Sequence, residues 1–127
     1  MAAYIWVGIG GAIGSVLRLF IANLGGVNWG DNFPWSTLFI NVTGSFAIGF
    51  LATFTGPEGR WIVTENTRLF FMTGICGGYT TFSAFSLQTL ALAQRGHLLY
   101  AGSYIMASVI LCLLAVWLGY IVATLAR

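Results

Sequence analysis

An apolar part of the chain is interrupted by residues 74–88, which read Gly74-Ile-Cys-Gly-Gly-Tyr-Thr-Thr-Phe-Ser-Ala-Phe-Ser-Leu-Gln88. The pair Gly77-Gly78 lowers helix propensity, and the hydroxyls of Thr80, Thr81 and Ser83 compete with the helical backbone for hydrogen bonds. The stretch therefore predicts a break in a helix. In a membrane, freed backbone groups are tolerated only where protein buries them, water reaches them or an ion binds them, so the break is also a predicted site.

The composition around this stretch is that of an integral membrane protein. Of 127 residues, 58% are hydrophobic and 6% are charged, whereas soluble domains carry roughly 25% charged residues. A membrane crossing needs about 20 apolar residues, so the chain has room for four crossings. We expect an all-α membrane protein with one domain, residues 1–127, and no nucleic-acid partner, because five Arg and no Lys are too few for a basic surface.

The hydropathy pattern predicts four membrane-spanning helices, the third of them broken, over residues 4–24, 34–54, 69–93 and 98–126. Three connections join them, at residues 25–32, 55–67 and 95–97. The first carries Asp31 and, with Trp29 and Trp35, an expected interfacial belt. His97 in the last is expected to be an interfacial loop histidine, and the two cysteines are expected to be small packing residues.

Polar residues inside the first two spans have two readings each. Gly10 and Gly14 have the spacing of close helix packing, and Arg18 follows one turn later. Arg18 either extends to the membrane interface or lines an aqueous vestibule. Asn41 lies on one face with Ser45, one turn further along the second span. Its amide either bonds a neighbouring helix or donates to a permeating anion.

The third and fourth spans each present a mixed face. After the break, Phe82, Phe85 and Gln88 share one face if the helix resumes. The fourth span aligns polar side chains at intervals of four, namely Tyr104, Ser108 and Cys112. Core packing and interhelical hydrogen bonding are the simplest explanations of both faces, and a polar ion path is the alternative.

The arginines do not select an orientation in the membrane. With four spans, Arg60, Arg68 and Arg127 lie on one side, and Arg95 lies on the other together with Arg18 if it extends outward. Three against two is almost no positive-inside bias. Insertion in both directions is then allowed, so we expect an antiparallel homodimer in which two copies bury their breaks against each other.

Three motifs, in this order along the chain, give the sequence a resemblance to the CrcB/Fluc family of small fluoride channels, also called fluoride exporters. They are Gly10-Gly11-x-x-Gly14-x-x-x-Arg18, Asn41-x-x-Gly44-x-Phe46 and Gly74-x-x-Gly77-Gly78-x-Thr80-Thr81-Phe82-Ser83-x-Phe85-Ser86. The similarity covers essentially the whole chain. Two positions depart from the family pattern: Ala84 stands where Thr is usual, and Gln88 where Glu is frequent.

The resemblance implies a dual-topology homodimer in a bacterial inner membrane, with two antiparallel anion pores. It places a structural sodium ion at the two-fold axis, held by backbone carbonyls of Gly77 and Thr80 from both copies. It further implies a phenyl pair beside each pore, an amide that faces the ion and a hydroxyl track. The residues concerned are Phe82 and Phe85 for the pair, Asn41 for the amide, and Tyr104, Ser108 and then Cys112 for the track.

Passive fluoride conduction is chemically consistent with these residues. Fluoride is small and strongly hydrated, so a pore must replace its water with donors that still release it. Neutral donors are expected from the amide, from Tyr104 and from the hydroxyls of Thr81, Ser83 and Ser108, with Gln88 and Arg18 beside the path. Phenyl edges are positive and also suit an anion.

Other classes fit less well. A small dual-topology multidrug transporter is the alternative function, but it needs a carboxylate within the membrane, and all three acids lie in or next to loops. A heme-carrying anchor needs paired histidines, and the chain has one. We expect no enzymatic activity.

Overall fold

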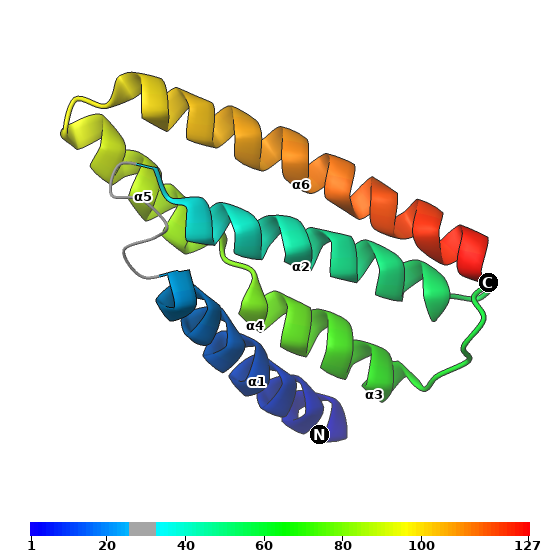
Figure 1. Cartoon of the computed structure of the whole chain (residues 1–127). Coiled ribbons are helices and arrows are strands. Elements are labelled where there is room, and N and C mark those ends of the chain that lie inside the picture. The colour runs from blue at the N-terminus through cyan, green and yellow to red at the C-terminus, as the bar shows by residue number, and fades with distance from the viewer. Residues whose placement is uncertain (26–32) are drawn as a thin grey trace.

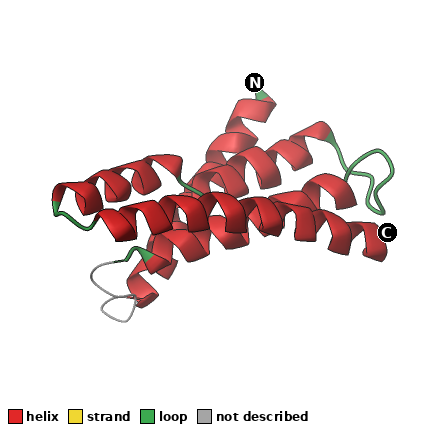
Figure 2. Ribbon diagram, turned by 90° about the horizontal axis from the view of Figure 1, so that it is seen from above, coloured by secondary structure: helices red, strands yellow, loops and turns green. Residues whose placement is uncertain are grey.

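The computed structural model describes residues 1–25 and 33–127, and this part of the chain consists of helices and loops without a strand (Figure 2). The helices follow one another as α1 (Ala2–Gly25), α2 (Trp35–Phe54), α3 (Glu65–Arg68), η2 (Leu69–Cys76), α4 (Gly77–Tyr79), α5 (Phe82–Gln94) and α6 (Leu98–Ala126) (Figure 1). The predicted loop 25–32, with Trp29 and Asp31, lies outside the described residues apart from Gly25, which ends α1.

Helices α1, α2 and α6 are each long and apolar enough to cross a membrane. Their bounds lie within two residues of the predicted spans, and α6 coincides with the predicted 98–126. The third predicted crossing, residues 69–93, is divided between two half-helices: α3, η2 and α4 form the first, and α5 forms the second. The chain is therefore a multi-pass membrane protein, as its composition predicted.

The predicted break within residues 74–88 is confirmed, and it lies just after the glycine pair. Gly77 and Gly78 are helical, and the extended residues are Thr80, with φ −83° and ψ 156°, and Thr81, with φ −149° and ψ 115°. Gly78 instead allows close packing, because a Cβ there would lie 2.5 Å from the Gly11 carbonyl oxygen. The residues from Leu69 to Cys76 form a π-helical segment, a geometry often found at functional sites.

Glycines also determine how the long helices pack. On α1, a Cβ at Gly10 would lie 2.5 Å from the Phe70 carbonyl oxygen, and one at Gly14 would meet the backbone of η2. The predicted close packing of α1 through these glycines is thus confirmed. Helix α2 packs on α6 in the same way, since Gly49 and Gly119 each face the backbone of the other helix.

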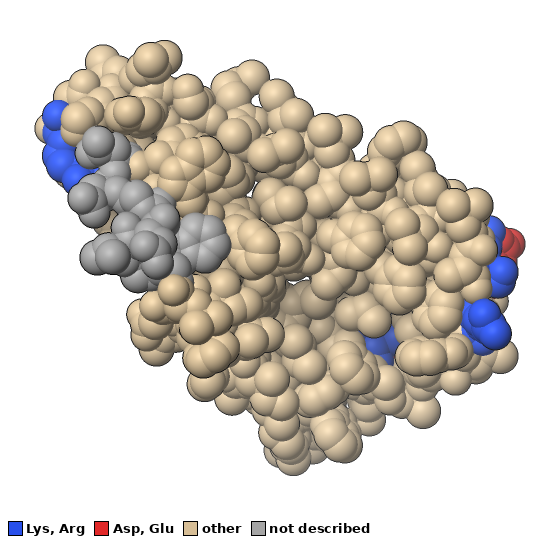
Figure 3. Space-filling view, in the orientation of Figure 1, with Lys and Arg blue, Asp and Glu red and all other residues tan. Residues whose placement is uncertain are grey.

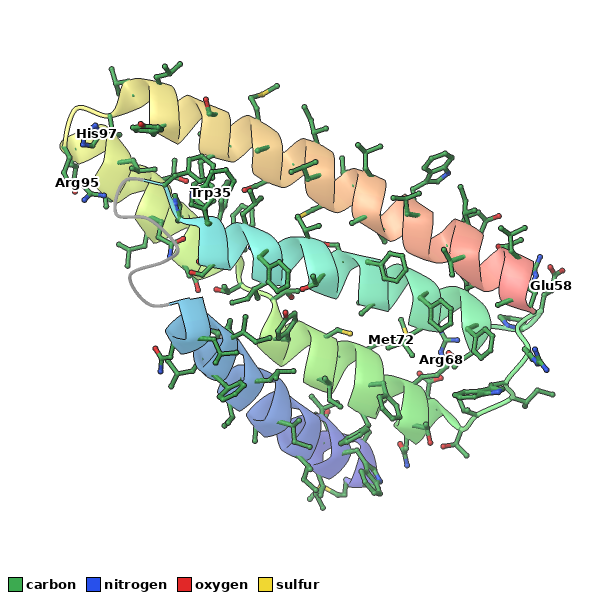
Figure 4. The ribbon with its side chains drawn as sticks, viewed as in Figure 1. Trp35, Glu58, Arg68, Met72, Arg95 and His97 are labelled. Atoms are coloured by element: carbon green, nitrogen blue, oxygen red, sulfur yellow. The ribbon has the colours of Figure 1, made fainter. Side chains whose placement is uncertain are left out.

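On the face that Figure 3 shows, most of the charged groups lie near the two ends of the bundle. Both termini and the α2–α3 loop lie at one end, as predicted, where Arg127 pairs with Glu58 at 3.6 Å. This loop is shorter than predicted, because Thr64 caps α3 and residues 65–67 are already helical. Arg95 and His97 lie at the other end, in the α5–α6 turn (Figure 4), where Gly96 has a φ of +82°.

Candidate functional site

A groove with a volume of about 400 Å³ opens beside the break in the third crossing. Helices α2, α4, α5 and α6, the C-terminal residue of η2 and the two extended threonines supply its walls, which are mostly apolar. The predicted site residues that line it are Asn41, Gly77, Thr80, Thr81, Phe82, Phe85 and Ser108, and Ser45, Cys76 and Cys112 lie there as well. We call this feature the break groove.

Asn41 joins α2 to the extended backbone of the break. Its Nδ2 donates to the Thr81 carbonyl oxygen at 3.1 Å, and its Oδ1 accepts from the Thr81 amide at 2.8 Å. One side chain thus satisfies the donor and the acceptor that Thr81 would otherwise leave unpaired, which is the requirement for broken backbone in a membrane. Of the two readings of Asn41, the hydrogen bond to a neighbouring segment is present. Its second amide N–H is not used in this pairing.

The second half-helix begins with a side-chain cap. The Thr81 Oγ1 accepts from the Ala84 amide at 3.1 Å and lies 3.3 Å from the Ser83 hydroxyl. Such a cap satisfies one of the free amides of a helix N-terminus. The remaining amides and the positive end of the α5 dipole lie at the break, where they favour negative charge.

The phenyl pair lies on one face of α5, as the spacing predicted. The ring centroids of Phe82 and Phe85 are 5.4 Å apart, and Phe85 also packs at 5.0 Å on Tyr104 of α6. Phe82 is 78% exposed in the isolated chain, so it is not a core residue of one copy. The pair therefore reaches from the bundle interior to an uncovered face.

The polar side chains of α6 differ in their surroundings. Tyr104 is fully buried, and its hydroxyl donates to the Gln88 Oε1 at 2.8 Å. Ser108 is 7% exposed, and its Oγ has no hydrogen-bond partner among the described residues. Cys112 lines the break groove one turn further on. Only Ser108 and Cys112 of the predicted track therefore face the groove.

Arg18 contacts the first half-helix from α1. Its Nε donates to the Gly78 carbonyl oxygen at 3.1 Å, near the end of the first half-helix. Ser15 contacts the same oxygen at 3.5 Å. The side chain is half-buried and is not among the residues that line the break groove.

Backbone carbonyls are the oxygen ligands that the break offers to a metal ion. In a continuous helix the Thr81 amide would bond the Gly77 carbonyl, but here it bonds Asn41, so Gly77 loses that partner. Gly77 and Thr80 both line the break groove. Within residues 1–25 and 33–127, no group of three His, Cys, Asp or Glu side chains is arranged to hold a metal.

Two features of the site were missed by sequence reasoning. The Asn41–Thr81 pairing joins residues 40 positions apart, and the Arg18–Gly78 contact joins residues 60 apart. The spacing of Gly10, Gly14 and Arg18 on one helix face was the only local signal for the second contact. For the first, a polar residue within the second span indicated a bond to another helix, but nothing local identified Thr81 as the partner of Asn41.

Comparisons with known proteins agree with the motifs. The family model described as CrcB-like protein, Camphor Resistance (CrcB), matches residues 5–120. A fluoride-specific ion channel of Paramagnetospirillum magneticum is 54% identical over 125 residues, which cover 98% of each chain.

Further relatives carry the same name. A fluoride-specific ion channel of Methylocella silvestris is 52% identical over 94% of this chain and 92% of its own. One of Rhodospirillum rubrum is 52% identical over 96% and 95%. These relatives are named as channels and not as enzymes. With the match over residues 5–120, this chain belongs to the CrcB-like family of membrane proteins.

Proposed function

We propose that the chain is a passive, fluoride-selective ion channel that exports fluoride across a bacterial inner membrane. The carrying observation is that neutral hydrogen-bond donors and a phenyl pair meet in the break groove of a chain whose near full-length relatives are named fluoride-specific ion channels. The alternative, a multidrug transporter that exchanges protons for cations, is disfavoured because no acidic side chain among the described residues lines the groove.

The donors of the break groove suit a strongly hydrated anion. The free hydroxyl of Ser108, the unused N–H of Asn41 and the edges of Phe82 and Phe85 supply partial positive charge without a side-chain cation. Such groups can replace hydration water and still release the ion. Cys112, which also lines the groove, would serve as a weaker donor.

We further propose that the working unit is an antiparallel homodimer with two pores. The exposed ring of Phe82 and the open side of the break groove support this, because a second copy would cover both. The difference in the number of arginines between the two sides of the membrane is small enough to allow insertion in both orientations.

A structural sodium ion at the dimer axis is consistent with the carbonyls freed by the break. Sodium prefers oxygen ligands, and unwound carbonyls at half-helix ends coordinate it in other membrane proteins. Gly77 and Thr80 would each give one carbonyl, and the equivalent pair of a second copy would complete a four-oxygen site. The ion would hold the two breaks together and add positive potential near the pores.

Ion efflux from proteoliposomes tests the proposed function. Vesicles loaded with potassium fluoride or potassium chloride are diluted into ion-free medium, and release is followed with ion-selective electrodes. A passive channel releases fluoride only when valinomycin lets potassium follow, and chloride stays inside. Equal chloride release, or fluoride release that needs no counter-ion path, would contradict the proposal.

The phenyl pair gives a matched pair of variants for the same assay. Phe82→Ile and Phe85→Ile remove the ring edge but keep an apolar side chain, so fluoride release should fall while the dimer remains on size-exclusion chromatography. Unchanged release in both variants would mean that the rings serve only in packing.

The structural sodium ion has its own test. Exchange of sodium for N-methylglucamine during purification should dissociate the wild-type dimer if the ion is structural.

A further inference from the structure

Arg18 is the arginine that reaches the break. All five arginines lie in the described residues and the chain has no lysine. The other four bond groups near the ends of the bundle: Arg60 bonds Ala126, Arg68 bonds Thr55, Arg95 bonds Ala91 and Arg127 bonds Glu58. The positive charge of Arg18 is thus the side-chain charge closest to the break.

The position of Arg18 coincides with a negative helix end. Residues 65–79 run through α3, η2 and α4 without a non-helical residue and end at the break, so their free carbonyls give that end a partial negative charge. The same break borders a groove that we propose to hold an anion. Left alone, this helix end would repel the anion.

Close packing of α1 makes the contact possible. Gly14 lies against the backbone at Ile75 and Tyr79, and Gly78 lies against the backbone at Gly11. The two backbones therefore approach closely along this face, and the Arg18 guanidinium reaches the last turn of α4 from α1, no described residue of which lines the break groove. It bonds the carbonyl of Gly78, which is also not a lining residue, whereas Gly77 and Thr80 line the groove.

We propose that Arg18 is a positioning residue that neutralises the negative end of the first half-helix and fixes its last turn, so that an anion is accepted on the groove side. It acts through the helix end and does not touch the ion. The inference rests on the proposed channel function. It predicts that the charge of Arg18 affects how well fluoride enters at low concentration more than how fast it moves at saturation.

Fluoride release from proteoliposomes, measured as a function of fluoride concentration, tests this. Arg18→Gln should raise the fluoride concentration for half-maximal release by about tenfold, the size of a partly buried charge–dipole interaction. Arg18→Lys should keep it within about twofold, because the charge remains at the same helix end. Arg95→Gln is the matched control, since it removes the same charge from the α5–α6 turn and should leave the curve unchanged.

If Arg18→Gln fails to assemble, a variant whose charge at position 18 changes with pH provides the same test. In Arg18→His, lowering the pH from 8 to 5.5 charges the ring in one folded protein and should shift the half-maximal concentration downward, while wild type shows no such shift. If wild type conducts fluoride but all Arg18 variants share its curve at every pH, the inference is wrong and the channel function stands. If wild type releases no fluoride, both are wrong.

Discussion

Replacement of Asn41 by Ala should destabilise the protein by about 2 kcal/mol, because it removes both partners of the Thr81 backbone. A hydrogen bond contributes about 1 kcal/mol net, and a buried group left unpaired costs about 1–3 kcal/mol. Two bonds are lost in this variant, at 3.1 and 2.8 Å. Thr81 is half-buried and lines the break groove, so water replaces part of the loss and the lower end of the range applies.

The free energy of unfolding is measured by titrating SDS into detergent micelles that contain the purified protein. Asn41→Leu keeps a similar side-chain volume without polar atoms, so it separates hydrogen bonding from packing and should lose as much stability as Asn41→Ala. Ser45→Ala is the control, because Ser45 lies one turn along α2 and lines the same groove.

The reasoning fails if Asn41→Ala unfolds within about 0.5 kcal/mol of wild type, the range of an unremarkable surface substitution. Loss of fluoride release with unchanged stability would assign Asn41 to the ion and not to the break. Recovery of stability in Asn41→Leu would assign the effect to packing. Loss of both stability and release, in Asn41→Ala and Asn41→Leu alike, is the expected result.

Three further changes are checked with the same titration. Gly14→Ala should cost at least about 2 kcal/mol, because its Cβ would meet the backbone of η2, whereas Gly8→Ala, with no atom within 4 Å, should be neutral. Gly96→Ala should cost about 1–2 kcal/mol, since its φ of +82° is unfavourable for a residue with a Cβ. Tyr104→Phe should cost about 1 kcal/mol, because the half-buried amide oxygen of Gln88 loses its donor. An effect below about 0.5 kcal/mol in any of the three destabilising variants would refute that variant's rationale.

The continuous helices could be predicted because their signal is local. The segment 98–126 is an unbroken apolar run that ends at a turn with Gly96 on one side, and α6 has those bounds. A membrane helix forms all its backbone hydrogen bonds within its own segment, so the length and hydropathy of that segment nearly determine where the helix lies. The close packing of α1 could also be predicted from its glycine spacing, because small residues at intervals of four are typical of closely packed helices in membranes.

The location of the break could not be predicted in the same way. The glycine pair and the hydroxyl residues place the break within residues 74–88 without separating Gly77 and Gly78 from Thr80 and Thr81, and a glycine in a membrane helix is also the residue that lets another backbone approach. Gly78 does this against Gly11, so it remains helical. The chain leaves the helix two residues later, where Asn41 supplies hydrogen bonds for the extended Thr81. The position of the break therefore depends on a residue of another helix, and no pattern in the sequence near the break indicates that residue.

Hydrogen bonds from two helices, α1 and α2, hold the third crossing at its break. On the α1 side, Arg18 occupies the Gly78 carbonyl, and on the α2 side Asn41 occupies both backbone groups of Thr81. Gly77 and Thr80 themselves line the break groove. A break whose carbonyls were all free would attract cations from every direction. With the negative end of the first half-helix neutralised from the α1 side, the positive end of α5 is left to favour an anion at the groove. We therefore expect Arg18 and Asn41 to be coupled: the double variant Arg18→Gln/Asn41→Ala should lose less stability than the sum of the single losses, because either change alone already frees the break.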